Sequence, residues 1–122
     1  MENGKVMIVD DDKEFLEELR ETLVLSGYSM IAVNDSLSAL DTAVREKPDV
    51  VVLDLMMPGK NGFQLADDLR HAPQLMQMPI IAMTGNFEEA CNPLIKMCDI
   101  KKCLKKPFNP LDIIAEIEAV LE

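Results

Sequence analysis

Aromatic residues are scarce in this sequence: Trp is absent, and there are only one Tyr and four Phe. Basic residues are scarce as well, since 12 Lys and Arg stand against 22 Asp and Glu, which gives a net charge of −10. A protein that binds nucleic acid needs cations that displace counterions from phosphates, and often aromatic rings on which bases stack. We therefore expect no contact between this domain and nucleic acid.

Cysteine and histidine are too few for a disulfide framework or a soft-metal site. The three cysteines, Cys91, Cys98 and Cys103, form no Cys-x-x-Cys pair, and His71 is the only histidine. An odd number of cysteines without a framework is typical of a reducing compartment. Apolar runs do not exceed four residues, and the first residues do not resemble a signal peptide. We therefore expect a cytoplasmic protein that does not enter a membrane.

Short apolar runs alternate with segments of helical periodicity. Strands are predicted at four apolar runs, 6–9, 30–33, 50–53 and 80–83. A weaker fifth strand is predicted at 101–105, where the flanking lysines favour a position at the edge of the sheet. Helices are predicted near 13–25, 36–46, 62–71, 93–98 and from Asn109 onward. This alternation predicts one α/β domain over residues 1–122, a doubly wound parallel sheet of order 2-1-3-4-5 between two layers of helices.

The same periodicity predicts which face of each helix is buried. In the first helix, leucines 16, 19 and 23 fall on one face with Phe15, and Asp12 is the expected N-cap. In the second helix, Leu37, Leu40 and Val44 are expected to face the core. In the last helix, the corresponding residues are Leu111, Ile114, Ile117 and Leu121.

Polar residues follow the carboxyl ends of four predicted strands. The first strand is followed by Asp10, Asp11 and Asp12, and the third by Asp54. The fourth strand is followed by Thr84, and the fifth by Lys106. Because the carboxyl ends of parallel strands share one edge of a sheet, these side chains should meet there. Clustered carboxylates repel one another, and Mg²⁺, with its preference for oxygen ligands, is the natural counterion. A lysine and a hydroxyl beside them suit the oxygens of a phosphoryl group, so the pattern predicts phosphoryl transfer onto an Asp.

Each of these residues also has an ordinary explanation when it is taken alone. Asp12 fits a helix cap, Thr84 a residue between a strand and a loop, and Lys106 a solvated charge. Only their joint placement at four strand ends indicates a site.

Five short motifs make the whole chain resemble the receiver domain of two-component response regulators. They are VDDD at 9–12, SGY at 26–28, VLDLMMPG at 52–59, IAMTG at 81–85 and KKPF at 105–108. The resemblance implies a flavodoxin-like three-layer sandwich. It implies that Asp54 accepts a phosphoryl group from a histidine kinase or a histidine phosphotransfer protein. It also implies that the phosphorylated domain switches conformation to control an output partner or an attached output domain.

The resemblance further implies how the residues around the acceptor act. Asp11 and Asp54 would bind Mg²⁺ directly, together with the carbonyl of Met56, and Asp10 would act through a bound water. Thr84 and Lys106 would hold the phosphoryl oxygens, and the peptide bond after Lys106 would be cis.

The sequence departs from the family pattern near the fifth strand. Asp99 and Ile100 stand where relatives usually carry Gly-Ala, and Cys103 stands where they carry Tyr or Phe. Pro93 falls where the fourth helix is normally under way. These differences leave the phosphorylation residues unchanged. They fall on the face that is used for signalling in the family, which is built from the fourth helix, the fifth strand and the fifth helix. We expect the loop over residues 85–92 to move on phosphorylation, with Phe87 as the moving aromatic.

Two other interpretations remain open. The Asp10-x-Asp12 pattern after an apolar strand resembles the haloacid-dehalogenase phosphatases, in which Asp10 would be the nucleophile and Asp12 the general acid. Glu14 stands where that family carries Thr or Val. The other interpretation is a degenerate receiver that only binds a protein partner, which the intact phosphorylation positions disfavour.

Overall fold

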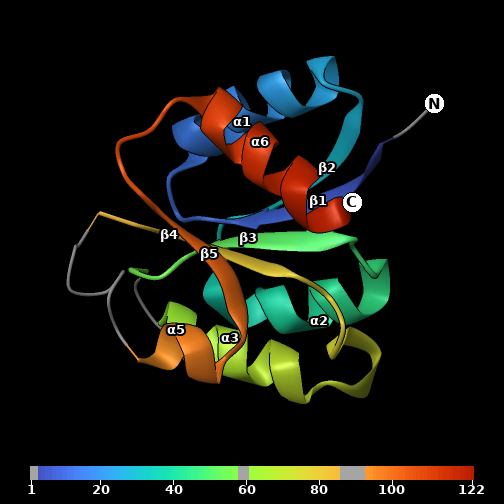
Figure 1. Cartoon of the computed structure of the whole chain (residues 1–122), viewed down its shortest axis with the longest axis vertical. Coiled ribbons are helices and arrows are strands. Elements are labelled where there is room, and N and C mark those ends of the chain that lie inside the picture. Colours follow the sequence, from blue (N-terminus) through green and yellow to red (C-terminus); the bar gives the residue numbers. More distant parts are fainter. Residues whose placement is uncertain (1–2, 58–60, 86–92) are drawn as a thin grey trace.

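Parallel strands form the centre of the molecule. A computed structural model describes residues 3–57, 61–85 and 93–122. The five-stranded sheet has the order β2-β1-β3-β4-β5, as the sequence predicted (Figure 1). The strands are β1 (Gly4–Val9), β2 (Tyr28–Val33), β3 (Val50–Asp54), β4 (Ile80–Thr84) and β5 (Ile100–Lys105). The lysine-rich β5 lies at an edge of the sheet, which confirms its predicted place.

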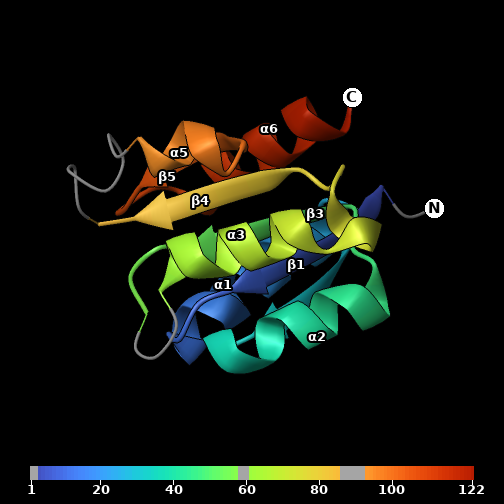
Figure 2. The ribbon, with the colours of Figure 1, turned by 90° about the horizontal axis from the view of Figure 1, so that it is seen from below.

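Helices cover both faces of this sheet. Figure 1 shows α1 (Lys13–Leu25) and α6 (Pro110–Leu121) on one face. On the other face lie α2 (Ser36–Glu46), α3 (Gly62–His71) and α5 (Leu94–Met97) (Figures 1 and 2). A short 3₁₀ turn, η1 (Pro73–Leu75), joins α3 to the segment before β4, and the sequence did not predict it. Among the described residues, no helix has both the length and the apolar character needed to cross a bilayer.

The core is divided into two layers by the sheet. Every residue of β3 is buried, because this central strand is covered on both faces. Alternate residues point to opposite sides: Val51 and Leu53 join the cluster under α2 and α3, whereas Val50 and Val52 join the cluster under α1 and α6. Burial of each such side chain stabilises the fold by roughly 1.5–3 kcal/mol before the cost of ordering the chain is counted. The central strand, and the carboxylate at its end, therefore have a rigid support.

Side chains cap the helices that follow the strands. Asp12 accepts the N–H of Phe15 at the start of α1, and Asp35 accepts the N–H of Leu37 at the start of α2. Capping boxes begin α3 and α6, with Asn61 and Asn109 at their N-caps. These caps hold the loops that join each strand to the next helix. The loops lie at the carboxyl edge of the sheet, where the site was predicted.

Two residues predicted to face the core are exposed. Leu37 is 72% exposed and Leu111 is 62% exposed. The prediction was wrong because periodicity does not give the rotational setting of a helix, and both residues lie in the first turn. Small residues make the closest contact in α2, where Ala39 and Ala43 are fully buried. Leu40 packs beside them and is partly buried.

The region before β5 also differs in detail from the prediction. The helix predicted at 93–98 is the shorter α5, and its expected cap, Asn92, lies outside the described residues. Asp99 has a φ of 53° and therefore adopts the left-handed conformation that glycine favours. Asp and Asn tolerate this conformation better than most residues, which explains how Asp99 replaces the family's glycine.

Candidate functional site

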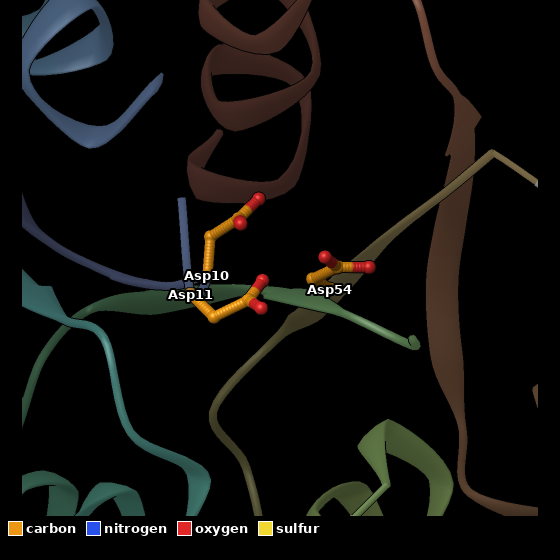
Figure 3. Close-up of side chains that lie close together, drawn as sticks. All are labelled: Asp10, Asp11 and Asp54. Atoms are coloured by element: carbon orange, nitrogen blue, oxygen red, sulfur yellow. The ribbon is translucent and has the colours of Figure 1, made fainter. Parts of the chain in front are cut away.

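The carboxylates of Asp10, Asp11 and Asp54 meet at the carboxyl edge of the sheet. Asp10 and Asp11 follow β1, and Asp54 ends the neighbouring strand β3. Figure 3 shows that the three side chains lie close together. One oxygen from each carboxylate lies within 4.8 Å of the others. The structure therefore brings together the three carboxylates that the sequence predicted as metal ligands.

Asp10 is fully buried, and both of its carboxylate oxygens accept hydrogen bonds. Its Oδ1 accepts the N–H of Asp12 at 3.0 Å. Its Oδ2 accepts a hydrogen bond from Lys106 Nζ at 2.6 Å. Asp10 is therefore held as an acceptor, and its negative charge is paired with a lysine from the far end of the chain.

Asp54 is also buried, and its surroundings disfavour its charged form. Oδ1 accepts the N–H of Met56 at 3.0 Å, and Oδ2 lies 3.5 Å from Lys106 Nζ. Burial raises the pKa of the Asp54 carboxyl, and the charge of Asp10 raises it further. The Met56 N–H and Lys106 lower this pKa, but they do not offset the burial. A cation bound beside Asp54 would favour its ionised form.

Lys106 is a half-buried cation that is shared by two carboxylates. Burial by itself lowers the pKa of its ammonium group, but the hydrogen bond with Asp10 and the charges of Asp10 and Asp54 outweigh burial and raise it. Lys106 therefore stays charged at neutral pH. The peptide bond from Lys106 to Pro107 is cis, as the resemblance implied.

Thr84 and Met56 lie at the same edge of the sheet. Thr84 is fully buried at the end of β4, the strand next to β3, and its carbonyl accepts the N–H of Lys106 at 2.7 Å. Met56 follows β3 and contacts the acceptor through the N–H donated to Asp54. The roles predicted for the Thr84 hydroxyl and the Met56 carbonyl stay predictions.

Sequence reasoning missed the aromatic surroundings of Lys106. The Lys106 Nζ lies 4.5 Å from the centroid of the Phe15 ring, and the Phe15 and Phe108 rings meet edge to face with centroids 5.9 Å apart. Phe15 was assigned only to the buried face of α1. The available signal was weak: both residues closely follow a strand-end motif, Phe15 after the aspartates and Phe108 after the lysine.

The residues assigned to the conformational switch are described only in part. Phe87 and its neighbours over 86–92 lie outside the described residues. Cys103 lies on β5, is half-buried and packs against the core cluster under α2 and α3. The proposed movement of the 85–92 loop therefore stays a prediction.

Known proteins resemble this chain over nearly its whole length. The family model of the response regulator receiver domain matches residues 6–118. The chain is 34% identical over 119 residues to the alkaline phosphatase synthesis transcriptional regulatory protein PhoP of Bacillus subtilis, covering 98% of this chain and 49% of that protein. It is 36% identical over 118 residues to the transcriptional regulatory protein CpxR of Escherichia coli, covering 97% of this chain and 49% of CpxR. The chain thus spans about half the length of these relatives.

Solved structures agree with the sequence relatives. The chemotaxis response regulator CheY4 of Vibrio cholerae superposes with a TM-score of 0.89 at 29% identity, over 96% of this chain and 98% of CheY4. A putative response regulator from Chloroflexus aurantiacus gives a TM-score of 0.88 at 26% identity, over 97% of each chain. The sheet order, the strand-end carboxylates and these matches lead to one conclusion: the chain belongs to the receiver domain family of two-component response regulators.

Proposed function

We propose that this domain accepts a phosphoryl group on Asp54 from the phosphohistidine of a histidine kinase or a histidine phosphotransfer protein. The observation that carries the proposal is the position of Asp54. It lies beside two further carboxylates, and its Oδ2 is 3.5 Å from the ammonium of Lys106. The lysine, and a cation held by the carboxylates, would bind a phosphoryl group on Asp54 and neutralise its charge.

The chemistry follows from these neighbours. An Asp54 carboxylate oxygen attacks the phosphorus, a P–O bond forms, and the P–N bond to the donor histidine breaks with its electron pair returning to the imidazole. Lys106 then pairs with the equatorial phosphoryl oxygens, and the Thr84 hydroxyl donates to another of them. The domain speeds the reaction by positioning and by electrostatic stabilisation, so it is a signalling phosphoacceptor that promotes its own labelling and slow dephosphorylation.

The acidic cluster fits Mg²⁺. Its donors are all hard carboxylate oxygens, and the buried Asp54 is destabilised in its ionised form without a counterion. We assign Asp11, Asp54 and the Met56 carbonyl as direct ligands and Asp10 as a ligand through water. When bound, Mg²⁺ supplies positive charge that offsets the negative charge of the carboxylates and the phosphoryl group.

The partners and location are part of the same proposal. The relatives PhoP and CpxR are transcriptional regulatory proteins that are about twice as long as the matched region. An attached or separate output module would therefore respond to the phosphorylated domain. We keep the cytoplasmic location in this proposal, because the sequence has an odd number of cysteines and no Cys-x-x-Cys framework.

The phosphatase alternative places the reaction on a different residue. It requires Asp10 as the nucleophile, but both oxygens of Asp10 are engaged by the Asp12 N–H and by Lys106. Asp10 Oδ2 lies 2.6 Å from Lys106 Nζ, whereas Asp54 Oδ2 lies 3.5 Å from it and is held less tightly, so the geometry favours Asp54 as the nucleophile.

Intact-mass measurement with acetyl phosphate and Mg²⁺ tests the proposal. The wild-type protein should gain one phosphoryl group, and Asp54→Asn should gain none. Asp10→Asn is the matched control: it should label slowly if Asp54 is the acceptor, and not at all if Asp10 is. Full labelling of Asp54→Asn would overturn the assignment. A wild-type protein that stays unlabelled would favour the degenerate receiver.

The metal ligands are tested by a Mg²⁺ titration. Asp11 is the exposed member of the cluster, so Asp11→Ala should fold normally. It should lose Mg²⁺ affinity by about tenfold or more. Asp12→Ala is the control, because Asp12 adjoins the cluster but its carboxylate caps α1. Equal Mg²⁺ affinity in the wild-type protein and Asp11→Ala would show that the ion binds elsewhere.

A further inference from the structure

The ammonium group of Lys106 contacts an aromatic ring as well as two carboxylates. Its Nζ is 2.6 Å from Asp10 Oδ2, 3.5 Å from Asp54 Oδ2 and 4.5 Å from the centroid of the Phe15 ring. A cation this close to a ring is attracted to the negative face of its π-system. The ring therefore occupies a side of the ammonium group that would otherwise be hydrated. The carboxylates of Asp10 and Asp54 are the polar groups that the ammonium contacts.

The Phe15 ring is itself held in place from two directions. The backbone N–H of Phe15 is donated to Asp12 Oδ1 at 3.1 Å, and the backbone N–H of Asp12 is donated to Asp10 Oδ1 at 3.0 Å. The Phe108 ring packs edge to face on the Phe15 ring, with an angle of 63° between their planes. The backbone of Phe15 is thus tied to the segment that carries Asp10, and its ring packs against the segment that carries Lys106.

A positioned ring matters because a lysine side chain is long and flexible. Lys106 has three donors on a four-carbon stem, and fixing that stem costs conformational entropy. Its side chain is still 27% exposed, so solvent competes for it. We propose that Phe15, supported by Phe108, is a positioning residue that holds Lys106 toward Asp54 for phosphoryl binding. This inference rests on the function proposed above, and it assigns to Phe15 a part in the reaction beyond packing α1.

The expected effect is a change in the rate of phosphorylation. Replacing the ring with an aliphatic side chain of similar volume removes the cation–π attraction and keeps the apolar packing. For a half-buried cation this attraction corresponds to a change of about five- to tenfold. Phe15→Leu should therefore be labelled about five- to tenfold more slowly than the wild-type protein, and should bind beryllofluoride correspondingly more weakly. Phe15→Tyr keeps the ring and should stay close to the wild-type rate.

The experiment uses acetyl phosphate as the donor. A small donor needs no docking surface, so a loss of contact between α1 and a donor protein cannot slow the reaction. Phe63→Leu is the matched control, because it removes a ring from α3 on the opposite face of the sheet. The circular dichroism spectrum and the urea midpoint of each variant establish that it is folded. NMR of the Lys106 side chain gives a readout that does not depend on labelling, since the ε-methylene protons carry a ring-current shift when they lie over Phe15.

The outcomes separate this inference from the proposed function. Slow labelling of Phe15→Leu, with the wild-type rate and the Lys106 ring-current shift both kept in Phe15→Tyr, supports the role of Phe15. Equal rates for Phe15→Leu and the wild-type protein overturn that role and leave the phosphoacceptor function intact. Equal slowing in Phe15→Leu, Phe15→Tyr and Phe63→Leu also overturns it, because the effect would then be one of packing. A wild-type protein that takes up no phosphoryl group overturns both.

Discussion

Lys106 Nζ donates a 2.6 Å hydrogen bond to Asp10 Oδ2, although the two residues are separated by 96 positions in the sequence. This ion pair joins the end of the last strand to the end of the first across the intervening strands. It places a positive charge inside an acidic cluster that would otherwise repel itself. The pair therefore holds the lysine beside the acidic cluster.

Removal of the lysine should destabilise the protein in the absence of metal. Lys106→Met leaves the buried Asp10 and Asp54 carboxylates without their cation, and we expect a loss of about 2 kcal/mol in the free energy of unfolding. Mg²⁺ should restore more stability to this variant than to the wild-type protein, because it supplies the missing charge. Urea denaturation with and without Mg²⁺ measures both effects. Lys102→Met, at an exposed position on β5, is the control and should change stability little. Equal stability of the wild-type protein and Lys106→Met would show that the ion pair does not stabilise the fold.

The raised pKa of Asp54 predicts how stability depends on pH. In metal-free buffer the folded protein binds a proton on Asp54 more tightly than the unfolded chain does. The stability that Asp54 contributes is therefore present below its ordinary pKa, and it is lost as the pH rises through the raised value. Asp54→Asn carries no charge and its side-chain oxygen still accepts the Met56 N–H. We expect it to be more stable than the wild-type protein at about pH 7, with a smaller difference at about pH 3.

Urea denaturation of the wild-type protein and Asp54→Asn at these two pH values measures the difference in stability. Asp41→Asn, which changes an exposed carboxylate on α2, serves as the control and should show little difference at either pH. A wild-type protein that is the more stable of the pair at neutral pH without metal would contradict the raised pKa of Asp54.

Close packing of α3 on the end of β3 makes Gly62 necessary. A Cβ atom at this position would lie 2.5 Å from the Cα of Leu55 and 2.7 Å from the carbonyl oxygen of Asp54. Gly62→Ala must therefore displace the backbone beside the acceptor, and we expect a loss of about 1–3 kcal/mol in stability together with slower labelling. Gly85→Ala is the control, because a Cβ there would contact none of the described residues within 4 Å. Thermal unfolding of both variants measures the difference, and equal melting temperatures would refute the packing argument.

Arg70 connects two segments that are far apart in the sequence. Its guanidinium donates hydrogen bonds to carbonyl groups of the turn after α3 and of the turn after α5, namely those of Leu75, Met76, Met78, Cys98 and Asp99. Arg70→Lys replaces a planar fork with a single ammonium that cannot reach both turns. We expect a loss of about 2 kcal/mol in stability, because carbonyl groups lose a charged donor.

Hydrogen exchange shows whether this loss is local. The amides of the α5–β5 turn should exchange faster in Arg70→Lys than in the wild-type protein. Arg45→Lys is the matched control, since the Arg45 side chain is 67% exposed and pairs only loosely with Glu46. Unchanged exchange around Asp99 in the Arg70 variant would show that the two turns are held together by other contacts.

The sequence by itself determined the fold and the composition of the acidic cluster. Each strand except the lysine-rich β5 contains a short apolar run, and each carboxylate of the cluster stands directly at or after the end of such a run. Once the alternation of strands and helices establishes a parallel sheet, the carboxyl ends must share one edge. Asp10, Asp11 and Asp54 were therefore predictable as neighbours from local patterns and topology alone.

Only the tertiary structure decided which helix faces are buried and what surrounds the lysine. A 3.6-residue period indicates that a helix has an apolar face, but the packing of small residues such as Ala39 and Ala43 sets its rotation and leaves Leu37 exposed. The contacts of Lys106 with Asp10 and Phe15, and those of Arg70 with two distant turns, join residues that no local pattern relates. They depend on side-chain direction and on distances of a few ångströms, which are settled only when the helices pack on the sheet.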